Sequence, residues 1–426
     1  MDQGNTAFLL IASALVLLMT PGLAFFYGGL VKAKSVISMM MMSFGAIGLI
    51  GVLWALYGYA IAFANQGVGQ FVGIDGIIGI DLGQIGLTDA YADALAPAGN
   101  YPTLAFVAFQ ATFAIITVAL ISGAIADRAK FGSWMLFAGV WATVVYFPVA
   151  SWVFNFTLSD GVTTDGGWIA YNLGALDFAG GTAVHINAGA AGLALALVLG
   201  KRVGFAKGAY VPNNPPFVLL GAGLLWFGWF GFNAGSELAA DGLASIAFIN
   251  TLAAPAAGVL GWLIIEKIKD GKPTSVGAAS GAVAGLVAIT PACAFLTPGW
   301  GILLGLIAGV VCALAIDLKF KLGFDDSLDV VGIHLVGGVI GTLYIGLVGN
   351  DAFGVAVGLL NGGGPAQLGK QALAAGAVLV YSFVLTYAIG WTIQKTIGFR
   401  INNEDEIAGV DTVVHGEEGY VLTSVR

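Results

Sequence analysis

Long apolar segments separated by short polar ones run along almost the whole chain. Eleven of these segments are long enough to cross a bilayer, because a membrane helix needs about 20 mostly apolar residues. They lie near 7–31, 36–64, 101–122, 133–156, 178–199, 216–236, 243–266, 276–296, 300–317, 328–350 and 371–397. The pattern predicts an all-α integral membrane protein with eleven transmembrane helices in residues 1–397. The polar stretch 398–426 is expected to form a C-terminal tail.

The basic residues predict the orientation of these helices. With strict alternation of the spans, nearly all of them fall on one side of the membrane, and only Lys370 falls on the other. The residues on the first side are Lys32, Lys34, Arg128, Lys130, Lys201, Arg202, Lys207, Lys267, Lys269, Lys272, Lys319, Lys321, Lys395, Arg400 and Arg426. Because loops rich in Lys and Arg stay in the cytoplasm, we expect the N-terminus outside and the C-terminus inside.

Composition supports the membrane assignment. Hydrophobic residues make up 58% of the 426 positions and charged residues only 9%, whereas soluble domains carry about 25% charge. Cys293 and Cys312 lie in different spans without metal-ligand spacing, so no metal site or cofactor is expected. The net charge of −8 comes largely from carboxylates outside the spans. Those in the external loop 65–100 either attract cations or belong to a solvated loop, and the second interpretation is favoured.

Two histidines inside apolar segments are the strongest chemical signal. His185 follows Asp177 by eight positions, and His334 follows Asp326 by the same spacing. An ionisable side chain within a membrane span usually marks a substrate or proton path. A single buried histidine is more simply a core residue that fixes helix contacts. A pair in matching sequence contexts favours a transport site where two halves of the protein meet.

The positions of this pair indicate an inverted repeat. The two histidine segments open spans five and ten, and a five-span unit enters the membrane in opposite directions in its two copies. Spans 1–5 and 6–10 therefore form an inverted 5+5 repeat, with the last helix added. At 1.5 Å per residue each histidine lies about 12 Å from its end of the span, so in a core about 30 Å thick the rings lie roughly 6 Å apart along the membrane normal.

Aromatic residues gather near the predicted outer ends of the spans. Phe109 and Phe113 share one face of span three, and Trp229 and Phe232 precede Ser236 at the end of span six. Ring faces attract cations and a hydroxyl accepts from an N–H. An interfacial aromatic belt or ordinary packing explains the same spacing equally well.

Asp177 has two compatible roles at the start of span five. It caps the helix together with Thr182, and it favours a cation nearby without contact. On the other side of the membrane, Asp326 and Asp329 are both candidates for its counterpart.

Three sequence motifs, in order along the chain, carry a family resemblance. They are Ala175-Leu-Asp-Phe-Ala-Gly-Gly-Thr-Ala-Val-His-Ile-Asn187, Trp229-Phe-Gly-Phe-Asn-Ala-Gly-Ser236 and Asp325-Asp-Ser-Leu-Asp-Val-Val-Gly-Ile-His334. With them the chain resembles the ammonium transporter family (Amt/Mep, related to the Rhesus proteins) over nearly its whole length. The resemblance implies a homotrimer in which each eleven-helix protomer has its own pore.

The resemblance also implies roles for individual residues. Phe113 and Ser236 match the family's outer ammonium site, with Asp177 supporting recruitment. The other matches are the phenylalanine gate Phe113 and Phe232, the twin-histidine pore His185 and His334, and the outer-pore aromatics Phe109 and Trp229.

One position departs from the family pattern. Phe154 occupies the place where many members carry a tryptophan at the pore mouth. Phenylalanine is the weaker cation–π partner, so a lower affinity is expected of a site that includes Phe154. Trp152 is two residues away and points roughly opposite on a helix.

The function implied is uptake of ammonium, with methylammonium as an analogue, across the cell membrane. Ammonium is deprotonated at the outer site, ammonia passes the histidines and the proton moves separately. The alternatives are an ammonium sensor that signals through its tail and an electroneutral ammonia channel of the Rhesus type. The tail 406–420 resembles the family segment that couples protomers and accompanies PII-type signalling proteins, with His415 structural. No enzyme motif is present, and no nucleic-acid partner is expected.

Overall fold

The computed structural model describes residues 1–64, 71–95, 99–159, 162–205, 211–351 and 354–420. Lys207, Arg426 and parts of the 65–100 loop and the tail lie outside these ranges. Within the described residues, eleven helices are long and apolar enough to cross a membrane. Their bounds agree with the predicted spans to within a few residues, so the all-α fold with eleven spans is confirmed.

Several spans consist of more than one helical segment, because wide π-helical or tight 3-10 turns interrupt them. The first six spans are α1 (Gln3–Leu30); α2 (Val36–Leu53), η1 (Trp54–Gly58) and α3 (Tyr59–Ala62); α5 (Thr103–Ile121) and η3 (Ser122–Ile125); α6 (Phe131–Trp141), η4 (Ala142–Tyr146) and α7 (Phe147–Phe154); η6 (Gly181–Ile186) and α8 (Asn187–Leu199); and α9 (Pro215–Gly235). The remaining five are α10 (Gly242–Lys269); α11 (Ser275–Ile289) and η8 (Thr290–Ala292); α12 (Pro298–Ala315) and α13 (Leu318–Leu322); η9 (Val331–Leu335) and α14 (Val336–Val348); and α15 (Ala366–Thr396).

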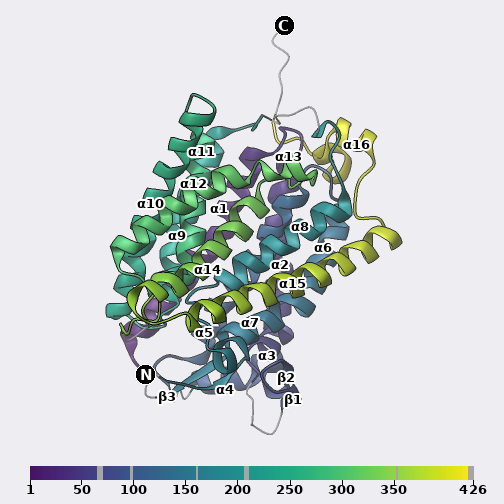
Figure 1. The fold of residues 1–426 in the computed structure, drawn as a ribbon. Coiled ribbons are helices and arrows are strands. Elements are labelled where there is room, and N and C mark those ends of the chain that lie inside the picture. Colours follow the sequence, from purple (N-terminus) through teal and green to yellow (C-terminus); the bar gives the residue numbers. More distant parts are fainter. Residues whose placement is uncertain (65–70, 96–98, 160–161, 206–210, 352–353, 421–426) are drawn as a thin grey trace.

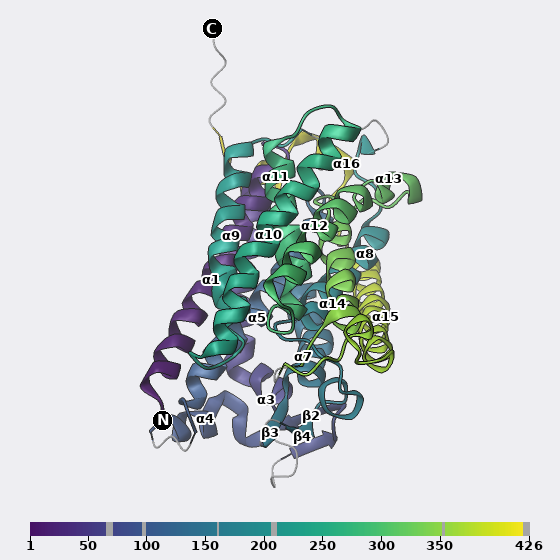
Figure 2. The ribbon, with the colours of Figure 1, turned by 60° about the vertical axis from the view of Figure 1, so that its left-hand side comes forward.

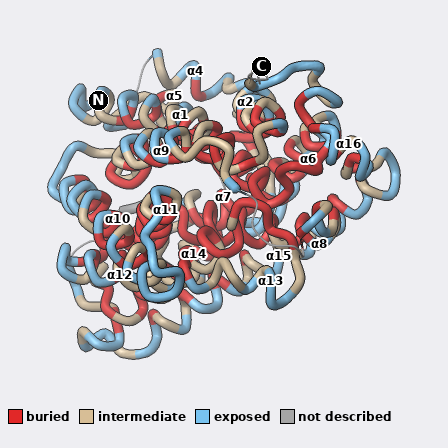
Figure 3. The backbone as a smooth tube through the Cα atoms, turned by 90° about the horizontal axis from the view of Figure 1, so that it is seen from above, coloured by how far each residue is buried: buried red, intermediate tan, exposed pale blue. Residues whose placement is uncertain are grey.

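Glycines let these helices approach closely. A Cβ on Gly305 of α12 would lie 1.9 Å from the carbonyl oxygen of Ala254 on α10, and one on Gly221 of α9 would lie 2.2 Å from the nitrogen of Phe26 on α1. Small residues at such contacts are typical of membrane helix packing. α1 and α9 run side by side (Figure 2), and buried residues gather along the centre of the bundle while exposed ones line its periphery (Figure 3).

The N-terminus and the described part of the tail lie at opposite ends of the bundle (Figure 1). The end with the N-terminus, called here the hairpin end, carries two antiparallel hairpins, β1 (Phe71–Ile74) with β2 (Ile78–Asp81) and β3 (Phe156–Ser159) with β4 (Val162–Gly166). It also carries η2 (Leu82–Leu87), α4 (Thr88–Leu95) and η5 (Ile169–Leu173). The described part of the predicted solvated loop 65–100 is folded, and most of its residues are exposed.

Hydrogen bonds fix the hairpins to the bundle. The indole of Trp152 on α7 donates to the carbonyl of Ile77, and the backbone N–H of Trp168 donates to that of Gly76 at 3.0 Å. The side chain of Asn155 donates to the carbonyl of Ala64 at 3.0 Å. The β1–β2 turn is therefore held against the end of α7, close to the segment that leads into η6.

The other end, called here the tail end, carries α16 (Asn403–Ala408) and η11 (Asp411–His415). The Asp411 carboxylate accepts from the N–H groups of Ile37 (3.0 Å) and Ser38 (2.7 Å), which caps the start of α2. The Lys34 ammonium donates to the carbonyl of Ile407. The described tail thus folds back onto its own bundle. The short η10 (Leu359–Asn361) lies between α14 and α15 in the sequence.

A buried ion network joins three segments at the tail end. The Arg202 guanidinium donates to Asp325 at 2.8 Å and to Asp127 at 2.9 Å, and all three side chains are almost fully buried. Burial alone would raise the pKa of Asp325, but the hydrogen bonds and charge of Arg202 outweigh it and lower that pKa below its usual value. Asp325 therefore stays ionised and holds the start of the His334 segment against the end of α8.

We expect Gly305→Ala to destabilise the protein, because the added methyl group would overlap the Ala254 carbonyl on α10. Overpacking of this kind costs about 1–3 kcal/mol, and thermal unfolding in detergent would show it as a lower midpoint. Gly376→Ala on α15 is the matched control, since a Cβ there meets nothing within 4 Å. Equal midpoints for the two variants would contradict the close contact between α10 and α12.

Candidate functional site

The structure brings His185 and His334 into direct contact near the centre of the bundle. Their Nδ1 atoms lie 3.3 Å apart and the ring centroids 5.3 Å apart, and both residues are buried. Each lies in a π-helical turn, His185 in η6 and His334 in η9, at the start of a span that begins at the opposite end of the bundle from the other. Since one Nδ1 donates and the other accepts, the two rings hold different tautomers.

A carboxylate caps each of these turns. Asp177 accepts from the N–H groups of Gly180, Gly181 and Thr182 at 2.7–2.9 Å and from the Thr182 hydroxyl. Asp326 accepts from the N–H groups of Val330 (3.1 Å) and Val331 (2.7 Å). The first N–H groups of a helix lack intrahelical partners, and carboxylates there also complement the helix dipole.

Asp326, not Asp329, is therefore the structural counterpart of Asp177. Asp329 instead forms an ion pair with Lys319 at 2.5 Å. Burial, together with the neighbouring Asp329, raises the pKa of Asp326 to about 6.

Two phenylalanine rings close the path above the histidines on the hairpin side. Phe113 and Phe232 stack with centroids 4.1 Å apart and planes at 12°. His185 follows 6.2 Å beyond Phe232, and Phe109 packs against Phe113 at 4.8 Å. All four residues are nearly inaccessible to solvent. The stack is a closed aromatic barrier directly next to the histidine pair.

Ser236 and Phe154 lie at the hairpin-side mouth of this barrier. The Ser236 hydroxyl ends α9 and donates to the carbonyl of Phe232 at 2.8 Å, so its lone pairs remain as acceptors. Phe154 meets Phe113 edge to face at 6.0 Å. Trp152 packs instead against Trp168 (5.7 Å) and Tyr381 (4.6 Å). Trp152 therefore does not join Phe154 beside Phe113.

Trp229 forms a wall beside the histidines. Its indole stacks on His185 with centroids 5.6 Å apart and planes at 28°. The indole N–H donates to the hydroxyl of Thr290 at 2.8 Å, and that hydroxyl donates to the carbonyl of Leu286. Sequence reasoning missed Thr290, because a threonine in an apolar span carries no visible signal of its partner.

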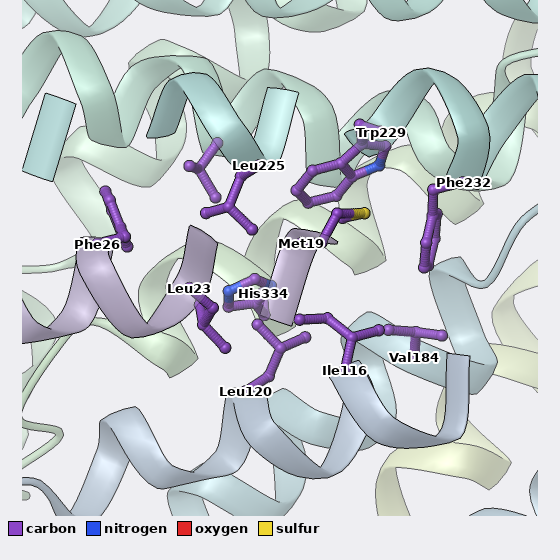
Figure 4. Close-up of a pocket in the computed structure, with 11 residues that line it drawn as sticks. Met19, Leu23, Phe26, Ile116, Leu120, Val184, Leu225, Trp229, Phe232 and His334 are labelled. Carbon is purple, nitrogen blue, oxygen red and sulfur yellow. The ribbon is translucent and has the colours of Figure 1, made fainter. Parts of the chain in front are cut away.

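A narrow apolar cavity of about 10 Å3 runs past His334 (Figure 4). That volume is at the lower limit for holding a single water molecule. Besides His334, Trp229 and Phe232, apolar side chains from five spans line it, namely Met19, Leu23, Phe26, Ile116, Leu120, Val184, Leu225 and Val283. These residues could not be recognised from the sequence, because pore-lining and core leucines look alike in a sequence.

In the described ranges, no group of three or more His, Cys, Asp or Glu side chains is placed to hold a metal ion. Cys293 and Cys312 are buried and carry no disulfide. The site is built from aromatic rings, two imidazoles, one hydroxyl and two capping carboxylates. Such a set can bind a small cation at its mouth and hydrogen-bond a small neutral molecule inside.

Comparison with known proteins identifies the family. The family model described as Ammonium Transporter Family matches residues 7–420. The chain belongs to the ammonium transporter family. It is 57% identical to an ammonium transporter of Mycobacterium tuberculosis, with 98% of this chain and 90% of that protein covered.

Solved structures of the family have the same fold. The crystal structure of Saccharomyces cerevisiae Mep2 matches with a TM-score of 0.81 and 34% identity over 95% of this chain and 91% of that one. A protein described as a sensor Amt protein matches with a TM-score of 0.86 and 28% identity, covering 96% and 98%. Proteins of the ammonium transporter family are transporters and not enzymes, and this chain is a multi-pass membrane protein.

Glu237, next to Ser236, gives a pH-dependent prediction. Burial and the neighbouring Asp241 raise the pKa of Glu237 to about 7. Its carboxyl is therefore neutral below that pH and gains negative charge above it, which favours a cation at the mouth. We expect the KM for methylammonium, which stays protonated in this range, to fall as the pH of the hairpin side rises from 6 to 8.

In Glu237→Gln this component of the pH dependence should disappear, as measured by uptake of labelled methylammonium into proteoliposomes. An identical pH profile in both proteins would contradict the assignment.

Proposed function

We propose that this chain takes up ammonium across the cell membrane by separating it into ammonia and a proton. The hairpin end faces outside and the tail end faces the cytoplasm, because the basic residues of the described ranges, apart from Lys370, lie at the tail end. The observation that carries the proposal is the buried histidine pair directly behind a closed aromatic stack.

Ammonium is recruited at the mouth formed by Phe113, Ser236 and Phe154. Ring faces attract a cation more strongly when water is excluded, and the Ser236 hydroxyl offers a lone pair to an N–H. Asp177 acts at a distance. Its carboxylate is occupied by backbone and Thr182 donors, so it favours the positive charge electrostatically without binding it.

Beyond the stack of Phe113 and Phe232, only neutral ammonia moves on toward the histidines. A bare ion in an apolar cavity would be destabilised by many kcal/mol, whereas ammonia can donate to and accept from the two imidazoles. Phe109 and Trp229 complete the walls. The proton crosses separately, and potassium is excluded because it has no proton to lose.

The same proposal extends to assembly and regulation. The family resemblance supports a homotrimer with one pore in each protomer. The tail (398–426) would be a regulatory segment that a PII-type signalling protein recognises at the cytoplasmic face. The residues 1–397 would form the transport domain.

We expect His185→Ala and His334→Ala each to abolish selective transport or to admit potassium, because the emptied ring volume lets water into the cavity. Solid-supported-membrane electrophysiology with ammonium, methylammonium and potassium would measure both effects. His415→Ala in the tail is the matched control and should keep potassium excluded. Selective, unchanged currents in both pore variants would refute the twin-histidine pathway.

We expect Phe154→Trp to lower the KM for methylammonium. A stronger cation–π contact contributes about 0.5–1 kcal/mol at an exposed site, which corresponds to about a two- to five-fold change in affinity. Uptake kinetics in proteoliposomes would measure it, with Phe156→Trp on β3, exposed at the hairpin end, as the control. An unchanged KM in Phe154→Trp would remove Phe154 from the ammonium site.

A second candidate function is ammonium sensing through the tail. The similarity to a sensor Amt protein and the folding of the tail against the bundle favour it. Capture of a cytoplasmic partner that depends on ammonium, with no measurable flux, would support sensing over transport.

A further inference from the structure

The segment that leads into η6 has no regular secondary structure, although part of it is buried. Residues 174–180 form neither helix nor strand, and Ala175, Ala179 and Gly180 are buried. Irregular backbone inside a membrane protein is tolerated only where its N–H and C=O groups find protein partners. Asp177 lies in the middle of this segment, so the groups that pair its backbone also determine where the Asp177 carboxylate lies.

Gln371 on α15 supplies such partners at Leu176. The Leu176 N–H donates to Gln371 Oε1 at 2.7 Å, and Gln371 Nε2 donates to the Leu176 carbonyl at 2.7 Å. One side-chain amide thus pairs both backbone groups of a residue, as the opposite residue does in an antiparallel sheet. Leu176 directly precedes Asp177, so these bonds fix the chain one residue before the carboxylate.

Two further groups fill the remaining hydrogen-bonding capacity of the buried Gln371 amide. Its Nε2 also donates to the carbonyl of Thr342 on α14 at 3.1 Å, and its Oε1 accepts from Gln367 Nε2 at 3.0 Å. Gln367 donates in addition to the carbonyl of Gly174 at 3.2 Å. A flipped Gln371 amide would place its oxygen against the carbonyl oxygens of Leu176 and Thr342, so these contacts allow one orientation only.

The helix that carries Gln371 is firmly seated. α15 runs beside α14 (Figure 1), and a Cβ on Gly346 of α14 would lie 2.4 Å from Leu368 Cα, so the two backbones touch. α14 continues the span of one pore histidine, and the segment 174–180 leads into the span of the other. Gln371 therefore joins both histidine-bearing spans from the eleventh span.

The same segment borders the mouth of the site. A Cβ on Gly180 would lie 3.5 Å from the Cζ of Phe154, and the N–H of Phe178 donates to the carbonyl of Pro291 at 3.1 Å. A shift of the segment would thus move the Asp177 carboxylate relative to the mouth. Because the attraction between opposite charges falls with distance, a displaced carboxylate favours an ammonium ion less.

We propose that Gln371 is a positioning residue for ammonium recruitment, which holds Asp177 at its distance from the mouth by pairing the backbone of Leu176. The inference rests on the proposed transport function and deepens it. Within the described residues, the hydrogen bonds of Gln371 go to Leu176, Thr342 and Gln367. Gln371 therefore acts through the segment 174–180 and not by contact with the cation.

The test is Gln371→Met in the full-length protein, which keeps the length of the side chain and removes the amide. We expect the KM for methylammonium uptake into proteoliposomes to rise several-fold, because the unpaired Leu176 groups turn toward water and carry Asp177 with them. The maximal rate should change less, since His185 also packs against Trp229. An unchanged KM, or a fall in the maximal rate alone, would overturn the proposal.

Thr386→Val is the matched control on the same helix. Thr386 is buried on α15 and accepts from the indole N–H of Trp141 at 2.8 Å. The variant therefore also loses a buried hydrogen bond, but one that does not involve the segment 174–180. It should lower the thermal unfolding midpoint and leave the KM unchanged. An equal rise in KM in both variants would reveal a general loss of packing and would contradict the positioning role.

Hydrogen exchange provides a readout that does not depend on flux. The amides of residues 180–182, which donate to Asp177, should exchange faster in Gln371→Met than in the parent. Those of residues 330–331, which donate to Asp326, should keep their protection. Unchanged exchange at residues 180–182 would refute the positioning of Asp177 by Gln371.

Gln371→Glu is a milder variant for the case that Gln371→Met does not fold. It keeps the shape of the side chain and an acceptor for the Leu176 N–H, and it lacks at least one of the two donors. We expect its KM and its exchange at residues 180–182 to lie between those of the parent and of Gln371→Met, and parental values of both would overturn the proposal. Absence of uptake by the parent would refute transport itself, whereas uptake by the parent with an unchanged KM in the Gln371 variants would refute the positioning role alone.

Discussion

The central constraint on this molecule is that two helices carrying histidines start within the protein, where water cannot satisfy their first N–H groups. Asp177 and Asp326 meet that need with seven hydrogen bonds between them, six from backbone N–H groups and one from the Thr182 hydroxyl. An unpaired buried N–H costs about 1–3 kcal/mol. The carboxylates thus determine where η6 and η9 begin, and hence where His185 and His334 meet.

The same hydrogen bonds prevent Asp177 from contacting a cation directly, while its charge can still favour a cation nearby. Because Asp177 is saturated by donors, it is not a free ligand, and a cation at the mouth interacts with it only through space. Inside, the stack of Phe113 on Phe232 and the apolar cavity remove water, which makes charge unfavourable there. In the proposed function, recruitment and passage therefore depend on different groups, and the aromatic stack is the boundary between them.

Much of the fold and the site was predictable, because membrane spans and charged loops obey strong physical rules. The eleven spans follow from apolar length, and the contact between His185 and His334 follows from two Asp/His spacings read in opposite directions. The hairpins over 71–81 and 156–166 were missed, since short strands outside the bilayer have no such rule. Sequence also left Asp326 and Asp329 undecided, because only the positions of the N–H groups and of Lys319 distinguish them.

The partners of single polar side chains were beyond sequence reasoning as well. Thr290 and Asn155 act through contacts with residues 61 and 91 positions away. The sequence around each of these residues does not indicate such distant contacts. The apolar residues that line the cavity could not be predicted from the sequence either, because leucine and phenylalanine occur both in packed cores and along pores.

The bond between the two imidazoles gives the conduit a built-in polarity. If the Nδ1 of one ring carries the shared hydrogen, its Nε2 is bare, and the Nε2 of the other ring must then carry a hydrogen. The passage therefore offers an acceptor on one ring and a donor on the next. With both rings neutral, the shared hydrogen can cross to the other Nδ1 only if that ring releases the hydrogen on its Nε2 and the first ring takes one up on its own Nε2. Both rings therefore exchange roles together, and the pair behaves as one bistable unit and not as two independent bases.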